Sequence, residues 1–319
     1  MQTYFPIRNN LISKDELYSL SSLNSKKLIF DIFFDWIIIF FSYFFIYINL
    51  NIILNIFLFL LIGTRIYSLF IIAHDGLHWR FSNSKKKNDL MVDFLILGAF
   101  FSSSTLNRNN HILHHKETAN DDDPDRFKYL KVNKKSFLST LLYFSGISSI
   151  VKVFKNIFLN HSSKLKRKES NRIKLLNILP IIMWQIILLT ITTKFFGKFG
   201  YIFFWLLPVY IFAYCADLIR VFCEHAVTYD ENQGDKKMRL INYDSNLFER
   251  IFFSPRNMNF HAIHHLYQSI PYYNLEKAND LIKQKIHINK NIDLKYENII
   301  WRKSYIGFII NYLLNVKNY

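Results

Sequence analysis

The sequence predicts an all-α integral membrane protein, with four transmembrane helices in two hairpins and a cytoplasmic helical cap. Three observations lead to this fold class. The 319 residues are 51% hydrophobic, and the apolar residues form four runs close to the roughly 20 residues that a spanning helix needs. The runs come in two pairs, with little chain between the members of a pair. The 40 lysines and arginines, against 24 aspartates and glutamates, lie mainly outside the pairs.

The first pair covers residues 28–48 and 51–73, and the second covers residues 175–193 and 201–223. Lysine and arginine concentrate before, between and after the two pairs. By the positive-inside tendency, these segments, both termini and the cap are expected on the cytoplasmic side. An even number of spans is consistent with this orientation.

Three regions follow from these spans. We expect a cytoplasmic N-terminal segment (residues 1–27), a membrane domain (28–276) and a C-terminal cytoplasmic or interfacial segment (277–319). Residues 1–27 lack the basic start, apolar core and cleavage site of a signal peptide.

Two shorter apolar stretches lie between the pairs. Met91–Phe101 has about half the length of a span, so it predicts an interfacial or re-entrant segment. Phe137–Leu159 has helical spacing with lysines among its apolar residues, which is typical of a helix lying in the interface. It leads into a polybasic segment, residues 164–174, whose charge suits anionic lipid headgroups.

Composition also excludes other classes of protein. A formal charge of +16 would suggest a nucleic-acid partner for a soluble protein. Here the charge follows the ends of the spans and forms no separate basic domain, so no nucleic-acid partner is expected. Cys215 and Cys223 are the only cysteines, and both lie inside an apolar run. A disulfide framework and a cysteine-ligated metal centre are therefore excluded.

Charged residues inside the spans predict ion pairs, because an unpaired charge in hydrocarbon is costly. Asp35 and Arg65 lie at similar depths in the first two spans, so we expect them to pair. Asp217, Arg220 and Glu224 are spaced to form one ladder near the end of the fourth span.

Histidine carries the strongest functional signal. Nine of the 11 histidines lie in three boxes of the expected cap, HDGLH, HILHH and HAIHH, or at the end of the fourth span in CEHA. Spacings of three and four place side chains on one face of a helix. At this histidine frequency, H-x-x-H-H should arise by chance roughly 0.01 times in such a chain, yet it occurs twice. The nine residues are His74, His78, His111, His114, His115, His225, His261, His264 and His265.

Nine imidazoles favour a site for two metal ions. Neutral imidazole suits iron, zinc and copper, and nine ligands exceed what one ion can use. A membrane zinc hydrolase is one alternative, because HDGLH has the H-x-x-x-H spacing of a zinc protease. However, Asp75 stands where that motif has its glutamate, and most of the histidines would have no role. A pair of oxygen-activating irons would use them all.

The order and spacing of the boxes resemble the membrane fatty acid desaturase and hydroxylase superfamily, over roughly residues 28 to 276. Three segments look like its bacterial acyl-lipid desaturase branch: HHKETANDDDPDRF, RVFCEHAVTYD and NFHAIHHLYQSIPYYNL. The resemblance implies a non-haem di-iron centre, with the nine histidines as ligands, that uses O2 and two electrons on an unactivated C–H bond. It implies a desaturase acting on a fatty acyl lipid. A lipid or carotenoid hydroxylase or ketolase of the same superfamily, and a catalytically inactive relative, are the alternatives.

We also expect carboxylates that hydrogen-bond to the ligating imidazoles, and a separate electron donor. Ligating imidazoles usually donate their second N–H to a carboxylate or carbonyl. The nearest carboxylates in sequence are Asp75, Asp125, Asp217 and Glu224, whereas Asp121–Asp123 is expected to be a solvated loop and Arg220 a structural ion-pair partner. No H-P-G-G haem motif is present, so electrons are expected from a separate ferredoxin or cytochrome b5-type carrier docking on the basic cytoplasmic surface.

Overall fold

The computed structural model describes residues 11–118, 120–129, 137–147, 175–226, 240–288 and 299–314. The chain is mostly helical, and four helices are long and apolar enough to cross a membrane. They are α3 (Ser25–Ile48), α4 (Ile52–Leu77), α9 (Leu175–Phe196) and a composite helix over Ile202–His225. The four long apolar helices predicted from the sequence are confirmed, and their ends lie within a few residues of the expected ones. The polybasic segment and the second half of the predicted interfacial helix lie outside the described residues.

Local sequence explains where the first two spans begin. The Asn24 side chain accepts a hydrogen bond from the Lys27 N–H, and the Asn51 side chain accepts from the Ile53 and Leu54 N–H groups. These caps satisfy amide groups that the first turn of a helix leaves free. α4 continues to Leu77, beyond the predicted apolar run, so His74 lies on the same continuous helix as that run.

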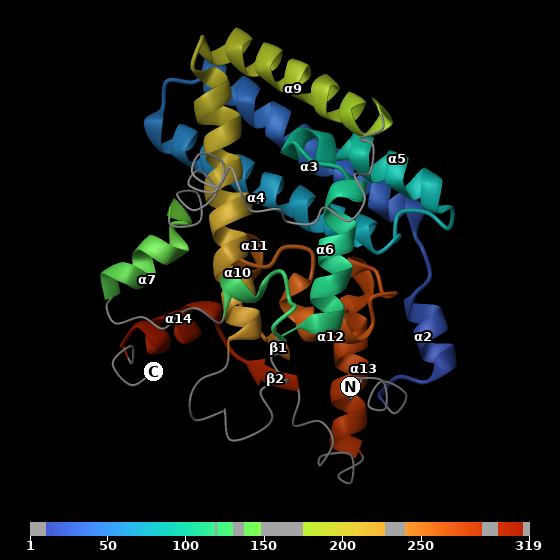
Figure 1. Cartoon of the computed structure of the whole chain (residues 1–319). Helices are drawn as coiled ribbons and strands as arrows, with labels where there is room; N and C mark the ends of the chain where they lie inside the picture. The colour runs from blue at the N-terminus through green and yellow to red at the C-terminus, as the bar shows by residue number, and fades with distance from the viewer. Residues whose placement is uncertain are drawn as a thin grey trace, which may run out of the picture.

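Aromatic packing joins the four spans into one bundle (Figure 1). α4 packs along α3 on one side and against the fourth span on another. The Trp36 ring of α3 stacks on Trp184 of α9 at 4.3 Å and on Trp205 of the fourth span at 5.9 Å. The Trp36 indole N–H donates to the Leu95 carbonyl, which satisfies the only polar atom of its side chain.

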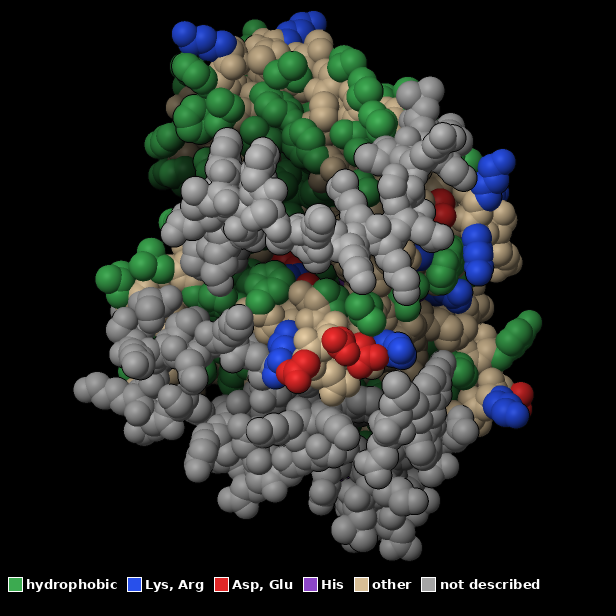
Figure 2. All heavy atoms as spheres, in the orientation of Figure 1, with side chains coloured by type: hydrophobic (Ala, Val, Ile, Leu, Met, Phe, Trp, Pro, Cys, Tyr) green, Lys and Arg blue, Asp and Glu red, His purple; other side chains and the backbone are tan. Residues whose placement is uncertain are grey.

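The fourth span is a composite of three segments. Two π-helical stretches, η3 (Ile202–Leu206) and η4 (Val209–Cys215), lead into α10 (Ala216–His225). α10 carries Arg220, Glu224 and His225 away from the bundle toward the histidine boxes. Among the described residues, many hydrophobic side chains lie on the upper part of the molecule, and charged side chains lie at its upper tip, along the right side and near the middle of the view (Figure 2).

The Met91–Phe101 segment breaks into two short helical pieces. Its first part is the end of α5 (Lys85–Leu95), and its second part contains η1 (Leu97–Phe100), which packs against α9. A Cβ on Gly98 would lie 2.5 Å from the Pro180 carbonyl oxygen, so this close approach requires glycine. Neither piece is long enough to span a membrane.

Short elements beyond the spans form a layer below the bundle in the view of Figure 1, and this layer carries the second and third histidine boxes. The sequence did not predict the small parallel sheet in this layer, which pairs β1 (Leu240–Tyr243) with β2 (Ile299–Arg302). The helical elements are α2 (Lys14–Leu20), α6 (Ser104–Glu117), η2 (Arg126–Lys128), α7 (Phe137–Phe144), α11 (Leu247–Phe252), η5 (Met258–Phe260), α12 (His261–Leu266), η6 (Tyr272–Asn274), α13 (Leu275–Ile288) and α14 (Tyr305–Leu314).

A buried ion cluster ties this layer to the first two spans. The predicted pair is confirmed, because Arg65 Nη1 lies 3.2 Å from Asp35 Oδ1. Arg256 adds a second cation, with Nη2 2.7 Å from Asp35 Oδ2 and Nη1 2.9 Å from Asp31 Oδ1. Ser68 donates a further hydrogen bond to Asp35. Since Arg256 shortly precedes the third histidine box, the cluster anchors that box to α3.

Replacing Asp35 with alanine should strongly destabilise the protein. The change leaves Arg65 without its carboxylate and Arg256 with only Asp31, and breaking a buried ion pair costs about 3–5 kcal/mol. The free energy of unfolding in detergent micelles measures this loss, with the exposed Asp15→Ala as the control. The charge-reversed pair Asp35→Arg with Arg65→Asp should not restore stability, because the new arginine would face Arg256. Wild-type stability of Asp35→Ala would contradict the assignment.

Candidate metal centre

All nine clustered histidines converge on one region below the bundle. They form two groups, and the potential ligand atoms of each group lie within 4.8 Å of one another. The five-histidine group takes side chains from α4, α6 and α12, whereas the four-histidine group takes them from α6, α10 and α12. The members are His74, His78, His111, His115 and His264 in the first group, and His114, His225, His261 and His265 in the second.

Helical spacing divides the second and third boxes between the two groups, whereas both histidines of the first box belong to the five-histidine group. On α6, His111 and His115 are four residues apart and share the five-histidine group, whereas His114 points to the other. On α12 the same division places His261 and His265 together and His264 apart. The H-x-x-H-H pattern thus supplies ligands to both groups from one helix, and it brings the groups into contact. The His115 and His265 rings stack across the boundary with centroids 4.0 Å apart.

Ring nitrogens within each group face one another. In the five-histidine group, the Nε2 atom of His111 lies 2.7 Å from that of His78 and 3.1 Å from that of His115. In the four-histidine group, His261 Nε2 lies 2.9 Å from His265 Nε2 and 3.1 Å from His225 Nε2. Two nitrogens bound to one ion at about 2.1 Å and at right angles would lie about 3.0 Å apart. The spacing therefore suits imidazoles that share an ion.

Burial favours the neutral form of an imidazole, which is the form that binds metal. Six of the nine are buried and the other three are partly buried. Burial lowers the pKa of six box histidines outside the spans well below the usual value, and neighbouring charges lower it further. The six are His78, His111, His115, His261, His264 and His265.

Asp123 orients one histidine of the four-histidine group. His114 Nδ1 lies 2.9 Å from Asp123 Oδ1, which directs Nε2 toward the group. Tyr129 donates a hydrogen bond to the other carboxylate oxygen. Burial alone would raise the pKa of Asp123, but its contacts with His114 and Tyr129 lower it below the usual range. The prediction of a solvated loop is wrong for this residue: Asp121 and Asp122 are exposed, whereas Asp123 is buried.

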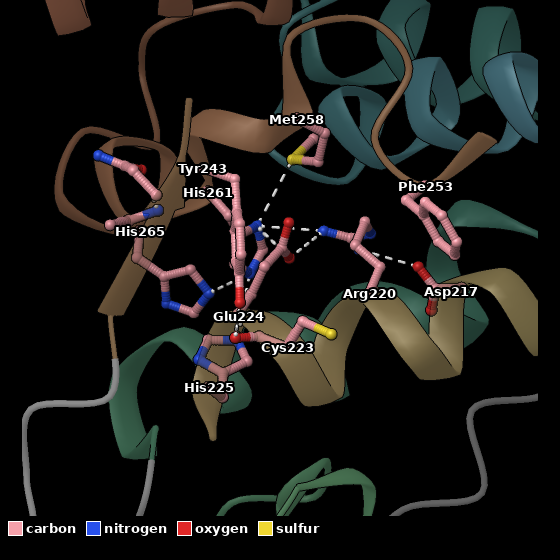
Figure 3. Close-up of polar contacts among 12 residues, drawn as sticks. Asp217, Arg220, Cys223, Glu224, His225, Tyr243, Phe253, Met258, His261 and His265 are labelled. Carbon is pink, nitrogen blue, oxygen red and sulfur yellow. Dashed lines mark hydrogen bonds and ion pairs between the residues drawn. The ribbon is translucent and has the colours of Figure 1, made fainter. Parts of the chain in front are cut away.

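The Asp217–Arg220–Glu224 ladder is confirmed and reaches the same group (Figure 3). Arg220 lies between the two carboxylates, 2.8 Å from Asp217 Oδ1 and hydrogen-bonded to Glu224 Oε2. The other Glu224 oxygen accepts from the Tyr305 hydroxyl at 2.7 Å. Glu224 Oε2 also lies 3.6 Å from His261 Nδ1, which places a carboxylate charge beside a candidate ligand. Arg220 is therefore a structural ion-pair partner, as expected.

The other carboxylates that the sequence suggested as partners of the ligands contact other groups. Asp75 accepts a hydrogen bond from the Tyr272 N–H, Asp125 pairs with Lys128, and Asp217 pairs with Arg220. Sequence reasoning did not identify Thr118, whose hydroxyl lies 3.3 Å from His265 Nδ1. Thr118 follows His114 by four residues, a spacing that places both side chains on one face of a helix, and this spacing could have identified it from the sequence.

Replacing Asp123 with asparagine should weaken metal binding by about 10- to 100-fold, because the partner that orients His114 is altered. Asp122→Asn, one residue away and exposed, is the matched control and should bind metal as the wild type does. Equilibrium titration of the metal-free protein with Fe(II) under anaerobic conditions distinguishes the two variants. Equal affinities for both variants would refute the role of Asp123.

Comparison with known proteins agrees with this geometry. Residues 51–290 match the family model described as fatty acid desaturase. The chain is also 26% identical over 280 residues to an sn-1 acyl-lipid omega-3 desaturase (ferredoxin) from Nostoc sp. (strain 36), an alignment that covers 82% of this chain and 76% of the relative. The family match includes all three boxes and His225, and it extends over most of the chain. The protein belongs to the fatty acid desaturase family.

Proposed function

We propose that this protein introduces a double bond into a fatty acyl chain of a membrane lipid, using O2 and electrons from ferredoxin. The observation that carries the proposal is the division of nine histidines into two adjoining groups within a desaturase-family chain. The acyl-lipid substrate and the ferredoxin donor are taken from the name of the Nostoc relative. Four apolar helices beside the histidine layer provide the membrane setting that such a substrate requires.

The residues present fit two iron ions. Every potential ligand atom of the two groups belongs to imidazole, a ligand that suits iron, and five and four ligands leave coordination positions for small molecules. Both ring nitrogens of buried His264 and the Nδ1 atoms of His74 and His115 have no hydrogen-bond partner among the described residues. Buried polar atoms are normally paired, so these nitrogens are suited to ligands or to bound solvent. When bound, the iron pair would supply the O2-dependent oxidation of an unactivated C–H bond.

The chain's own residues would bind the metal ions, orient the ligating rings and exclude water. The nine histidines would hold the metal ions, with Asp123, Glu224 and Thr118 beside the second nitrogens of three of them. The spans and the short helices around the boxes bury the groups, which keeps water from competing with the acyl chain. The fold thus provides a largely buried site at the end of the bundle.

We also propose the hairpin topology and orientation expected from the sequence. Both helix pairs would form hairpins, with the termini and the histidine layer on the cytoplasmic side. The excess of lysine and arginine outside the pairs supports this arrangement. Soluble ferredoxin could then reach the layer directly, and a basic surface would favour an acidic carrier.

Expression in a host with saturated acyl lipids should produce new double bonds. Mass spectrometry of the extracted lipids measures the amount of unsaturated product and locates its double bond. His264→Ala should reduce the product to background, because it removes a candidate ligand, whereas His287→Ala, exposed on α13, should leave it unchanged. New hydroxyl groups instead of double bonds would identify a hydroxylase and overturn the proposal.

Metal analysis tests the cofactor separately. Purified protein should contain close to two irons per chain, in keeping with two histidine groups. Production of the product should require added ferredoxin, its reductase and O2. A single zinc with no iron would instead support a hydrolase.

A further inference from the structure

α4 ends at a histidine of the first box, and an unusual residue follows. The Arg80 N–H donates to the Asp75 carbonyl at 3.1 Å, and the Trp79 N–H donates to the Gly76 carbonyl at 3.2 Å. This pair of bonds is the Schellman motif, with His78 as the helix cap. The residue after the cap takes a left-handed conformation and is usually glycine. Here it is Trp79, with φ 56°, although a side chain in that conformation costs about 1–2 kcal/mol.

Arg108 of α6 provides a reason for tryptophan at this position. Its guanidinium carbon lies 4.4 Å from the centroid of the Trp79 ring. The same guanidinium donates to the Leu77 carbonyl at 2.9 Å and to the Gly76 carbonyl at 3.3 Å. One buried side chain therefore satisfies the last carbonyls of α4 and also stacks on the ring that follows them.

A third helix fixes the orientation of Arg108. Both terminal nitrogens of its guanidinium donate to the Asp89 carboxylate of α5, one of them at 3.0 Å. Such a two-point contact fixes the plane of the guanidinium as well as its position. The neighbouring Asn88 side chain donates to the Gly76 carbonyl at 2.8 Å, so α5 also contacts the end of α4 directly.

These contacts lie within one helical turn of two histidines. Leu77 precedes His78, and Arg108 precedes His111 by three residues on α6. The Nε2 atoms of His78 and His111 lie 2.7 Å apart in the five-histidine group. A shift of α4 against α6 would therefore change that distance directly.

We propose that Trp79, Arg108 and Asp89 form a clasp that positions the first histidine box against the second and so sets the metal affinity of the five-histidine group. The three are positioning residues and not ligands. The inference rests on the proposed function only in taking the histidine groups as metal sites, and it does not depend on the reaction.

Trp79→Gly separates this role from simple helix termination. Glycine relieves the left-handed backbone but removes the ring that packs on Arg108. The clasp predicts that the affinity of one metal site falls by about 10- to 100-fold despite the more favourable backbone. A role in ending the helix predicts unchanged or higher stability and unchanged metal binding. Phe101→Gly is the matched control, because exposed Phe101 has φ 55° and should gain only the backbone relief.

Titration of the metal-free protein with Co(II), followed by the cobalt absorption bands, gives the affinities without any assay of activity. The wild type and Phe101→Gly should bind two ions alike, and Trp79→Gly should bind one of them more weakly. Arg108→Lys should weaken the same site, because lysine keeps the charge but loses the planar contacts, whereas Trp79→Phe should retain binding through its ring. Circular dichroism checks the fold of each variant.

Wild-type cobalt affinities in Trp79→Gly would overturn the clasp. If that variant does not fold, the cobalt affinities of Arg108→Lys and Trp79→Phe are compared instead. A weaker affinity in Arg108→Lys alone supports the clasp, and wild-type affinity in both variants overturns it. Failure of the proposed function gives a different result, since the wild type itself would then bind fewer than two ions or form no double bonds.

Discussion

The structure depends on bringing nine imidazoles from separate parts of the chain into one largely buried region. Each imidazole has one nitrogen for the shared centre and a second nitrogen whose partner determines the orientation of the ring. Buried polar atoms are costly unless they are paired. The fold meets this constraint with helices that carry histidines at spacings of three and four, and with Asp123, Glu224 and Thr118 placed behind three of the rings.

Three arginines connect the segments that carry the histidines. Arg108 precedes the second box and holds the end of α4, whereas Arg256 precedes the third box and pairs with Asp31 and Asp35 on α3. Arg220 precedes His225 and contacts both Glu224 and the Tyr67 hydroxyl of α4. Each guanidinium is a multipoint donor, so it fixes direction as well as distance. Carboxylate or carbonyl partners in each case offset part of the cost of burying the charge.

The sequence predicted most of the fold and the histidine site, because both depend on local patterns. Apolar runs of span length predicted the four helices, although α4 extends four residues past its predicted end, through the polar residues His74 and Asp75 to Leu77. Contacts between distant segments were less predictable. Asp123 lies in an acidic run that resembles a solvated loop, and only the folded chain brings its partner Tyr129 and His114 to it. The β1–β2 sheet joins strands of four residues from distant segments, too short for a periodic signal.

The coordination of the irons tests the central claim most directly. X-ray absorption spectroscopy of the iron-loaded protein measures the mean number of imidazole ligands per iron through their outer-shell scattering. Two groups of five and four histidines predict a mean between four and five imidazoles per iron. A mean of two to three imidazoles, with oxygen ligands making up the rest, would contradict the account.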